Sequence, residues 1–217
     1  GDFLQAAGPM KAIRAHHPQA KITLLTTKPY KELARKSGYF DDIWIDDRPK
    51  WYQIKDILAF RKKLNQAGFT RIYDLQNNDR TSGYFRLFSP KPEWVGVAKG
   101  ASHRNIDPAR TAGHALDGHI QTLAKAGLKN IKLDKLEWLD EDVSEFKPQG
   151  DYVLIVPGCS AENPGKRWLA DGYGAFCKKL TEQNLTPLIL GTDPEKEIGD
   201  EIKKICPQAQ NLCGKTS

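Results

Sequence analysis

Short apolar runs rich in β-branched residues alternate with longer stretches in which apolar residues recur at helical spacing. This alternation constrains the fold more than any other feature, because strands that alternate with helices build a parallel, doubly wound sheet. In the first part of the chain the pattern predicts strands at 22–26, 42–46, 71–75 and 94–97, and helices at 30–36, 50–67 and 111–126. An earlier helix is predicted by the spacing of Phe3, Ala6, Ala7, Met10 and Ile13, and Pro9 should kink or restart it.

The alternation stops at 139–151, where the sequence LDEDVSEFKPQGD is acidic and has no apolar periodicity. We interpret this segment as a linker between a domain at 1–140 and a second domain at 151–217. After the linker the alternation restarts and predicts strands at 152–156, 186–190 and 211–213, and helices at 168–183 and 194–206. The sequence therefore predicts two successive α/β domains, of which the second stops early.

The formal net charge of +6, with a sequence pI near 9.0, favours anionic partners. The basic residues are spread along the chain, so we rank a phosphate-bearing or membrane-surface partner above nucleic acid. A lysine-rich surface without a specific partner is the plainer reading. No apolar run is long enough to span a membrane, and the start does not resemble a secretory signal.

The cysteines all fall in the last third of the chain and form no Cys-x-x-Cys pair, and no histidine lies among them to complete a zinc site. We interpret them as reduced thiols of a cytoplasmic protein that mostly fill the core. They are Cys159, Cys177, Cys206 and Cys213.

The first candidate site residue is Asp2, which follows Gly1 and precedes the first helical stretch. If a strand precedes it, the pair lies at a strand-to-helix turn, where ligands bind in such sheets. The carboxylate then accepts a proton from a substrate hydroxyl as a general base. The plainer alternative is a helix N-cap.

A second candidate stretch, VPGCSAENPGKRW, follows the strand expected at 152–156. Gly158 and Ser160 allow the backbone to approach a phosphate, which Lys166 and Arg167 can neutralise. The alternative is an exposed basic pair with Trp168 as a buried anchor. The spacing differs from that of a P-loop, and so does that of the final GKT, so neither is an ATPase signature.

Two further stretches carry candidate binding residues. LILGTDPEKE offers Gly191, Thr192 and Glu195, and Glu195 serves either a ribose hydroxyl or the dipole of the helix that it begins. The polar stretch at 98–114 is long for a connection and is typical of a binding loop, although a disordered surface loop is the plainer reading. Its arginines can hold an acidic acceptor, and its histidines are His103 and His114.

Taken together, these stretches resemble glycosyltransferase family 9, the ADP-heptose:lipopolysaccharide heptosyltransferases. The resemblance covers almost the whole chain and depends on the opening GDFLQAAGPMKAIRAHHPQAKITLLT, on IYDLQNNDRT, on PGCSAENPGKRW, on PLILGTDPE and on LCGKTS. It implies two Rossmann-like domains in the GT-B arrangement, with a first strand and a later donor segment that this chain lacks. We therefore expect the second domain to be incomplete and the chain itself to turn over poorly.

The resemblance also implies roles for individual residues. Asp2 is the expected general base and Lys166 the cation that neutralises the leaving diphosphate. The donor ADP-heptose is expected to contact Gly158, Ser160, Lys166, Arg167, Gly191, Thr192, Glu195, Lys215 and Thr216. The anionic lipopolysaccharide precursor is expected to contact Arg80, His103 and Arg104.

The expected function is inverting transfer of heptose to the lipid A–Kdo inner core, without a metal, by a cytoplasmic protein peripheral to the inner membrane and without nucleic acid. The alternatives are another GT-B activity, such as an epimerase, and a non-catalytic module that binds an anionic ligand.

Overall fold

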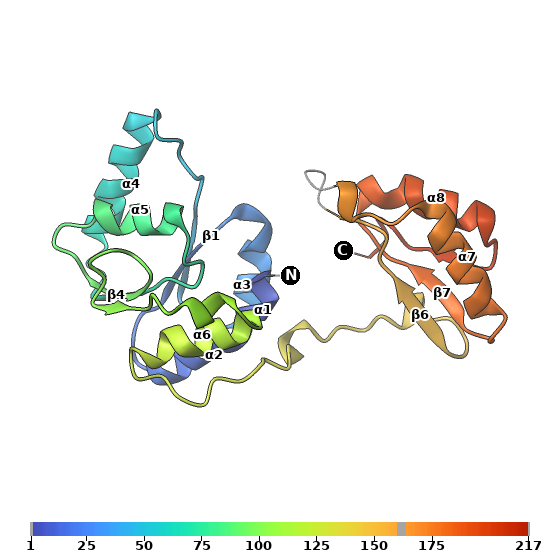
Figure 1. Ribbon diagram of the computed structural model, residues 1–217, viewed down its shortest axis with the longest axis horizontal. Coiled ribbons are helices and arrows are strands. Elements are labelled where there is room, and N and C mark those ends of the chain that lie inside the picture. The colour runs from blue at the N-terminus through green and yellow to red at the C-terminus, as the bar shows by residue number, and fades with distance from the viewer. Residues whose placement is uncertain (1, 160–163, 217) are drawn as a thin grey trace. The chain divides into compact units, whose positions relative to one another are not determined.

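The computed structural model describes residues 2–159 and 164–216, and it is an α/β structure in which every strand pair of these residues is parallel. The chain divides into two compact units, residues 1–140 and 141–217 (Figure 1). Each unit has its own hydrophobic core, because the core clusters contain residues of one unit only.

The first unit contains two small parallel sheets, one of β1 and β2 and one of β3, β4 and β5 in that order. The strands are β1 (Thr23–Thr26), β2 (Asp42–Ile45), β3 (Arg71–Tyr73), β4 (Glu93–Gly96) and β5 (His103–Arg104). The helices are α1 (Asp2–Gln5), α2 (Ala7–His16), α3 (Lys31–Ser37), α4 (Ile54–Gln66), α5 (Asp79–Leu87) and α6 (Ala115–Ala124). Short 3₁₀ turns lie at η1 (Lys28–Tyr30), η2 (Pro108–Thr111) and η3 (Glu137–Leu139).

The ends of these helices follow from local hydrogen bonds. The helix is interrupted at Ala6, between α1 and α2. Pro9 lies in the first turn of α2, where a missing backbone N–H costs little. Helix α4 begins later than predicted, because the Lys50 amide donates to Gln53 Oε1 and closes a turn first. Helix α6 begins at Ala115, because His114 Nδ1 accepts from the Leu116 amide and caps it.

Helix α5, strand β5 and the turn η2 of the first unit were not predicted. Helix α5 follows the polar run QNN, in which Asn78 forms a capping box with Thr81. Strand β5 and the turn η2 lie inside the 98–114 stretch, and Asn105 is buried there with its side chain bonded to Thr122 Oγ1 at 3.0 Å. The reading of that stretch as a disordered loop is therefore wrong, because parallel pairing to β4 and this buried contact order it.

The second unit contains one parallel sheet in the order β6, β7, β8. Its elements are η4 (Ser144–Phe146), β6 (Tyr152–Ile155), η5 (Pro164–Lys166), α7 (Ala170–Thr181), β7 (Thr186–Ile189), η6 (Asp193–Glu195), α8 (Lys196–Ile205) and β8 (Gln210–Asn211). Helices α7 and α8 pack together over one sheet face (Figure 1), where Cys177, Ile189 and Ile202 are fully buried.

Two expectations about side chains in this unit have different outcomes. The prediction that the cysteines mostly fill the core is confirmed for Cys177, Cys206 and Cys213, which are buried and free. The reading of Trp168 as a buried anchor is wrong, because 53% of it is exposed. Its ring instead lies edge-on to Tyr173, outside the core.

Candidate functional site

A hollow of about 420 Å³ lies at the carboxyl ends of β6 and β7 in the second unit. In parallel sheets this edge is where ligands bind, because the strand-to-helix loops converge there. The segments after β6 and β7 and one residue after β8 supply its lining, which consists of Val156, Gly158, Cys159, Leu190, Gly191, Thr192, Glu195 and Thr216. The structure thus brings together five residues that the sequence proposed for a donor: Gly158, Gly191, Thr192, Glu195 and Thr216.

The carboxylate of Glu195 is the charged group of this hollow. Its Oε2 accepts a hydrogen bond from the Thr192 amide at 2.9 Å and another from the Thr192 hydroxyl. These bonds, with the positive charge of Arg167 added, lower the pKa of Glu195 below its ordinary value. The side chain therefore stays ionised and held in place at the mouth of the hollow.

Two glycines make room for this carboxylate. A Cβ on Gly158 would lie 2.7 Å from Glu195 Cγ, and one on Gly191 would lie 2.7 Å from Glu195 Cβ. From the sequence, Gly158 was expected to let the backbone approach a phosphate, and Gly191 was expected to contact the donor. In the structure they also permit Glu195 itself to reach the lining.

A third glycine, Gly214, has a φ of +70°, and its Cβ would lie 2.3 Å from Asp193 Oδ1. Glycine is therefore required where the chain turns after β8, next to the ion pair of Asp193 with Lys196. The sequence did not identify Gly214 as a residue that a turn requires. Its place directly after a strand, at the start of GKT, could have indicated such a turn.

The remaining donor candidates are absent from the lining of this hollow or lie outside the described residues. Lys166 ends η5 and Arg167 follows it, and both side chains are exposed and absent from the lining. Lys215 is exposed next to Thr216. Ser160 lies outside the described residues.

In the first unit Asp2 lies in the first turn of α1 and is exposed. Asp2 is the first residue of α1, and its carbonyl accepts from the Ala6 amide at 3.1 Å. A carboxylate in this first turn interacts favourably with the positive end of the helix dipole. The structure gives Asp2 an accessible position but leaves its role as a base a prediction.

A polar cluster that was not predicted from the sequence lies at the carboxyl end of β3. Asp74 directly follows this strand and is only 5% exposed. Its Oδ1 accepts from the amides of Gln76 and Asn77 at 3.1 and 2.9 Å. Burial raises the pKa of this carboxyl above its ordinary value, despite these bonds.

Several atoms of this cluster are buried and have no hydrogen-bond partner among the described residues. They are two acceptors and two donors, namely Asp74 Oδ2, Asn77 Oδ1, Arg80 Nε and Trp94 Nε1. Gly96 adjoins them, since its Cβ would lie about equally close to Asp74, Asn77 and Trp94. A charged residue immediately after the short strand RIY was the signal in the sequence.

The candidate acceptor residues are at this edge of the first unit. Arg80 donates through Nη2 to Gln76 Oε1 at 3.1 Å, and so belongs to the Asp74 cluster. His103 and Arg104 form β5, where Arg104 pairs with Gly96 of β4. Arg104 Nε donates to the Val97 carbonyl, and His103 Nδ1 lies 3.0 Å from Ser102 Oγ.

The described residues contain neither a cluster of metal ligands nor a helix that could span a membrane. Across residues 2–159 and 164–216, no group of three or more His, Cys, Asp and Glu side chains is placed to hold a metal ion. In the same part of the chain, no helix has the length and apolar character that crossing a bilayer requires.

Comparison with known proteins identifies one family. The sequence model of glycosyltransferase family 9 (heptosyltransferase) matches residues 57–217. No curated protein sequence matches the chain.

Solved structures of similar fold include proteins of two organisms. The glycosyl transferase family 9 protein of Veillonella parvula has a TM-score of 0.73 at 16% identity, over 99% of this chain and 66% of that one. E. coli ADP-heptose LPS heptosyltransferase II has a TM-score of 0.69 at 17% identity, over 100% of this chain and 70% of that one. E. coli heptosyltransferase WaaC with ADP has a TM-score of 0.67 at 13% identity, over 98% of this chain and 70% of that one. The chain thus spans about two thirds of the length of these proteins and has their α/β fold over that part.

Proposed function

The chain belongs to glycosyltransferase family 9, and from this premise we propose that it binds ADP-heptose and transfers the heptose to the lipopolysaccharide inner core. The observation that carries the proposal is the hollow at β6 and β7, where an ionised Glu195 lies among glycine-rich loops. A carboxylate at such an edge is suited to accept hydrogen bonds from ribose hydroxyls. E. coli WaaC, which has a similar fold, was solved with ADP.

The proposed chemistry is an inverting displacement that needs no metal. Asp2 takes the proton of the acceptor hydroxyl, whose oxygen attacks the anomeric carbon of the heptose. The bond from that carbon to the diphosphate breaks, and ADP leaves with the electron pair. Lys166, with Arg167 next to it, balances the negative charge that develops on the diphosphate.

The proposed acceptor is the anionic lipid A–Kdo precursor, held in the first unit. Arg80, His103 and Arg104 supply positive or donating groups at the carboxyl edge of its strands. Next to Arg80, Asp74 Oδ2 and Asn77 Oδ1 are buried acceptors that have no hydrogen-bond partner among the described residues. We place the reaction at the cytoplasmic face of the inner membrane, where such a precursor is anchored.

The decisive experiment is calorimetric titration of the chain with ADP, UDP, AMP and adenosine. We expect ADP to bind more tightly than UDP. Lys166→Ala should weaken ADP about tenfold or more and leave adenosine unchanged, because it removes a charged contact to the diphosphate only. Preference for UDP would contradict the donor assignment, and equal weakening of all ligands would contradict the role of Lys166.

Transfer is then assayed by mass spectrometry of a lipid A–Kdo acceptor mixed with ADP-heptose. We expect only slow formation of a product heavier by one heptose, and Asp2→Asn should abolish it while ADP affinity is retained. A donor sugar altered in the absence of acceptor would instead identify an epimerase. Binding of ADP with no product from either mixture would favour a non-catalytic module.

A further inference from the structure

The outer face of α4 and the turn before it expose an unusual amount of apolar surface. Trp51 is 85% exposed, Ile54 64% and Leu58 55%, while Tyr52 lies edge-on to Trp51. In Figure 1 the start of α4 lies at the tip of the first unit. The opposite side of the helix already supplies its packing, because Leu64 and its half-buried neighbour Phe60 join the core.

Basic side chains flank this apolar stripe. Ile54, Leu58 and Arg61 recur at helical spacing, and Lys62 adjoins them on the same face. The exposed Lys55 and Lys50 lie at the start of the stripe, with the Lys50 ammonium 5.7 Å from the centre of the Tyr52 ring. Over residues 2–159 and 164–216, neither Arg61 nor Lys62 forms an ion pair with a carboxylate.

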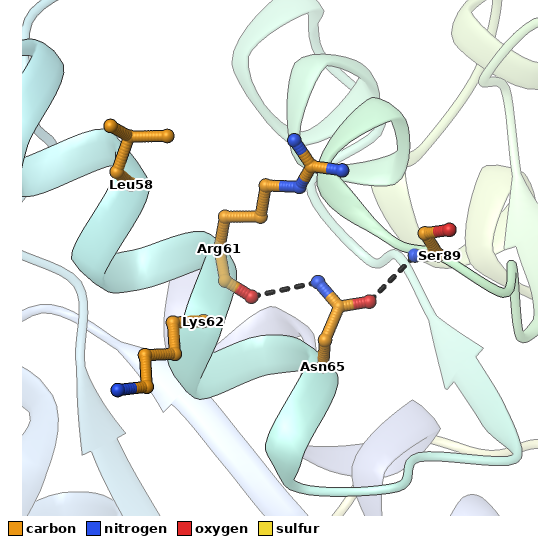
Figure 2. A pocket seen from close by; sticks show the side chains of 5 residues that line it. All are labelled: Leu58, Arg61, Lys62, Asn65 and Ser89. Carbon is orange, nitrogen blue, oxygen red and sulfur yellow. Dashed lines mark hydrogen bonds between the residues drawn. The ribbon is translucent and has the colours of Figure 1, made fainter.

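A shallow hollow of about 340 Å³ lies on this face, lined by Leu58, Arg61, Lys62, Asn65 and Ser89. Figure 2 shows the Arg61 and Lys62 side chains extending away from the helix. Asn65 fixes the floor, since it donates to the Arg61 carbonyl at 2.7 Å and accepts from the Ser89 amide at 2.6 Å. The hollow therefore combines an apolar side chain with two cations on a rigid backbone.

We propose that this face, Lys50 to Lys62 of the first unit, is the surface with which the protein docks on a bilayer rich in anionic phospholipid. A helix that has apolar residues on one face and cations around them lies in the plane of the membrane interface. Tryptophan and tyrosine favour the headgroup level, where Trp51 and Tyr52 would enter. Lysine and arginine bury their stems and keep their charges among lipid phosphates.

Charge favours this occupant over a second copy of the chain. A symmetric dimer through the same face would bring one positively charged surface against another, and like charges repel. Anionic headgroups instead complement these cations. The inference rests on the proposed function only for its setting at the inner membrane, since vesicle binding requires neither donor nor acceptor.

The test is flotation of the chain with phosphatidylethanolamine vesicles, with and without phosphatidylglycerol. We expect binding to the mixed vesicles and at least about tenfold weaker binding without phosphatidylglycerol. Arg61→Glu with Lys62→Glu, or Trp51→Ser with Leu58→Ser, should each weaken binding to mixed vesicles about tenfold or more. Since all four residues are exposed, the thermal midpoint should stay unchanged.

Matched controls come from the same unit. Lys99→Glu with Lys129→Glu makes the same charge change elsewhere, and Leu133→Ser removes an equally exposed leucine. These variants should bind vesicles as the unchanged chain does. Equal weakening by the controls, or binding that ignores phosphatidylglycerol, would overturn the proposal. So would a dimer that Trp51→Ser abolishes. The vesicles contain no nucleotide sugar, so failure here is distinct from failure of ADP to bind.

Discussion

Glu195 shows how one side chain ties the local fold to the candidate site. Its bonds to Thr192 close the capping box that begins η6 and lead into α8, and the same carboxylate faces the hollow. Gly158 approaches it from the neighbouring loop because glycine has no Cβ there. The sequence predicted both readings of Glu195, a helix-dipole role and a ligand role. The structure shows that its position at the start of the helix is compatible with both.

Gly158→Ala should therefore damage the hollow more than the fold. The added Cβ would lie 2.7 Å from Glu195 Cγ, so Glu195 must move and its bonds to Thr192 weaken. We expect about 1–3 kcal/mol lower stability and about tenfold weaker ADP binding, measured by urea unfolding and calorimetry. The control is Gly83→Ala in α5, where nothing lies within 4 Å of the new Cβ. That variant should be stabilised by about 0.4–1 kcal/mol, and a loss of ADP binding there would contradict this role of Gly158.

Asp74→Asn tests whether burying the charge of Asp74 lowers the stability of the fold. Burial raises the folded-state pKa of Asp74 above the ordinary value of 3.8. The penalty of the buried charge is therefore absent below that ordinary value, and it grows as the pH rises towards the raised folded-state pKa. Asparagine keeps an oxygen for the Gln76 and Asn77 amides and carries no charge.

The difference in unfolding free energy, variant minus unchanged chain, should thus be more positive at pH 7 than at pH 3. A tenfold change in the acid dissociation constant of Asp74 on folding would contribute about 1.4 kcal/mol to this difference. Urea unfolding at both pH values measures it. An equal difference at the two pH values would mean that Asp74 is not desolvated.

At the scale of elements, the apolar pattern predicted most strands and helices, and it predicted the ends of the strands better than those of the helices. The run DIWI forms β2 and YVLI forms β6 close to the predicted bounds, because short apolar runs rich in β-branched residues favour strands locally. Helix α5 was missed because its sequence is polar and its start is defined by the Asn78 cap. Strand β5 has two residues and exists through pairing with β4, which no local pattern specifies.

The candidate site was predictable to a similar degree. Glycines and acids after strands marked the loops of the second-unit hollow, because strand ends and helix starts can be read locally. The Asp74 cluster was not predicted, since its unpartnered atoms on Asn77, Arg80 and Trp94 are defined by burial. Burial depends on contacts between distant segments, which the pattern of one segment does not contain.

Gly8→Ala tests the close packing of helix α2 against the backbone at Lys132 in the first unit. Gly8 lies in α2 against the segment that follows α6, and its Cβ would lie 2.0 Å from the Lys132 carbonyl oxygen. Because that atom is backbone, the segment and the helix must separate. We expect a loss of about 1–3 kcal/mol or more in urea unfolding. Gly83→Ala is again the helical control, and a Gly8→Ala chain as stable as the control would contradict this packing.

At the scale of the whole molecule, the two units have separate cores. The first-unit clusters include buried Ile13, Phe85 and Phe3, and the second-unit cluster centres on Ile189 and Ile202. Stability in such a chain is expected to be a property of each unit, because apolar burial acts within a contiguous core. In the proposals made above, donor binding belongs to the second unit and the docking face to the first.

Ile202→Ala tests this independence. Ile202 is fully buried between α8 and the sheet, so the truncation should cost about 2–5 kcal/mol within the second unit. Hydrogen exchange followed by mass spectrometry should show faster exchange at 141–217 and unchanged exchange at 1–140. Saturating ADP should slow the second unit again, since a ligand stabilises the state that binds it. Vesicle binding should be unaffected, because its surface lies in the first unit. Faster exchange throughout the chain would mean that the two cores unfold as one, and the assignment of separate tasks would lose its physical basis.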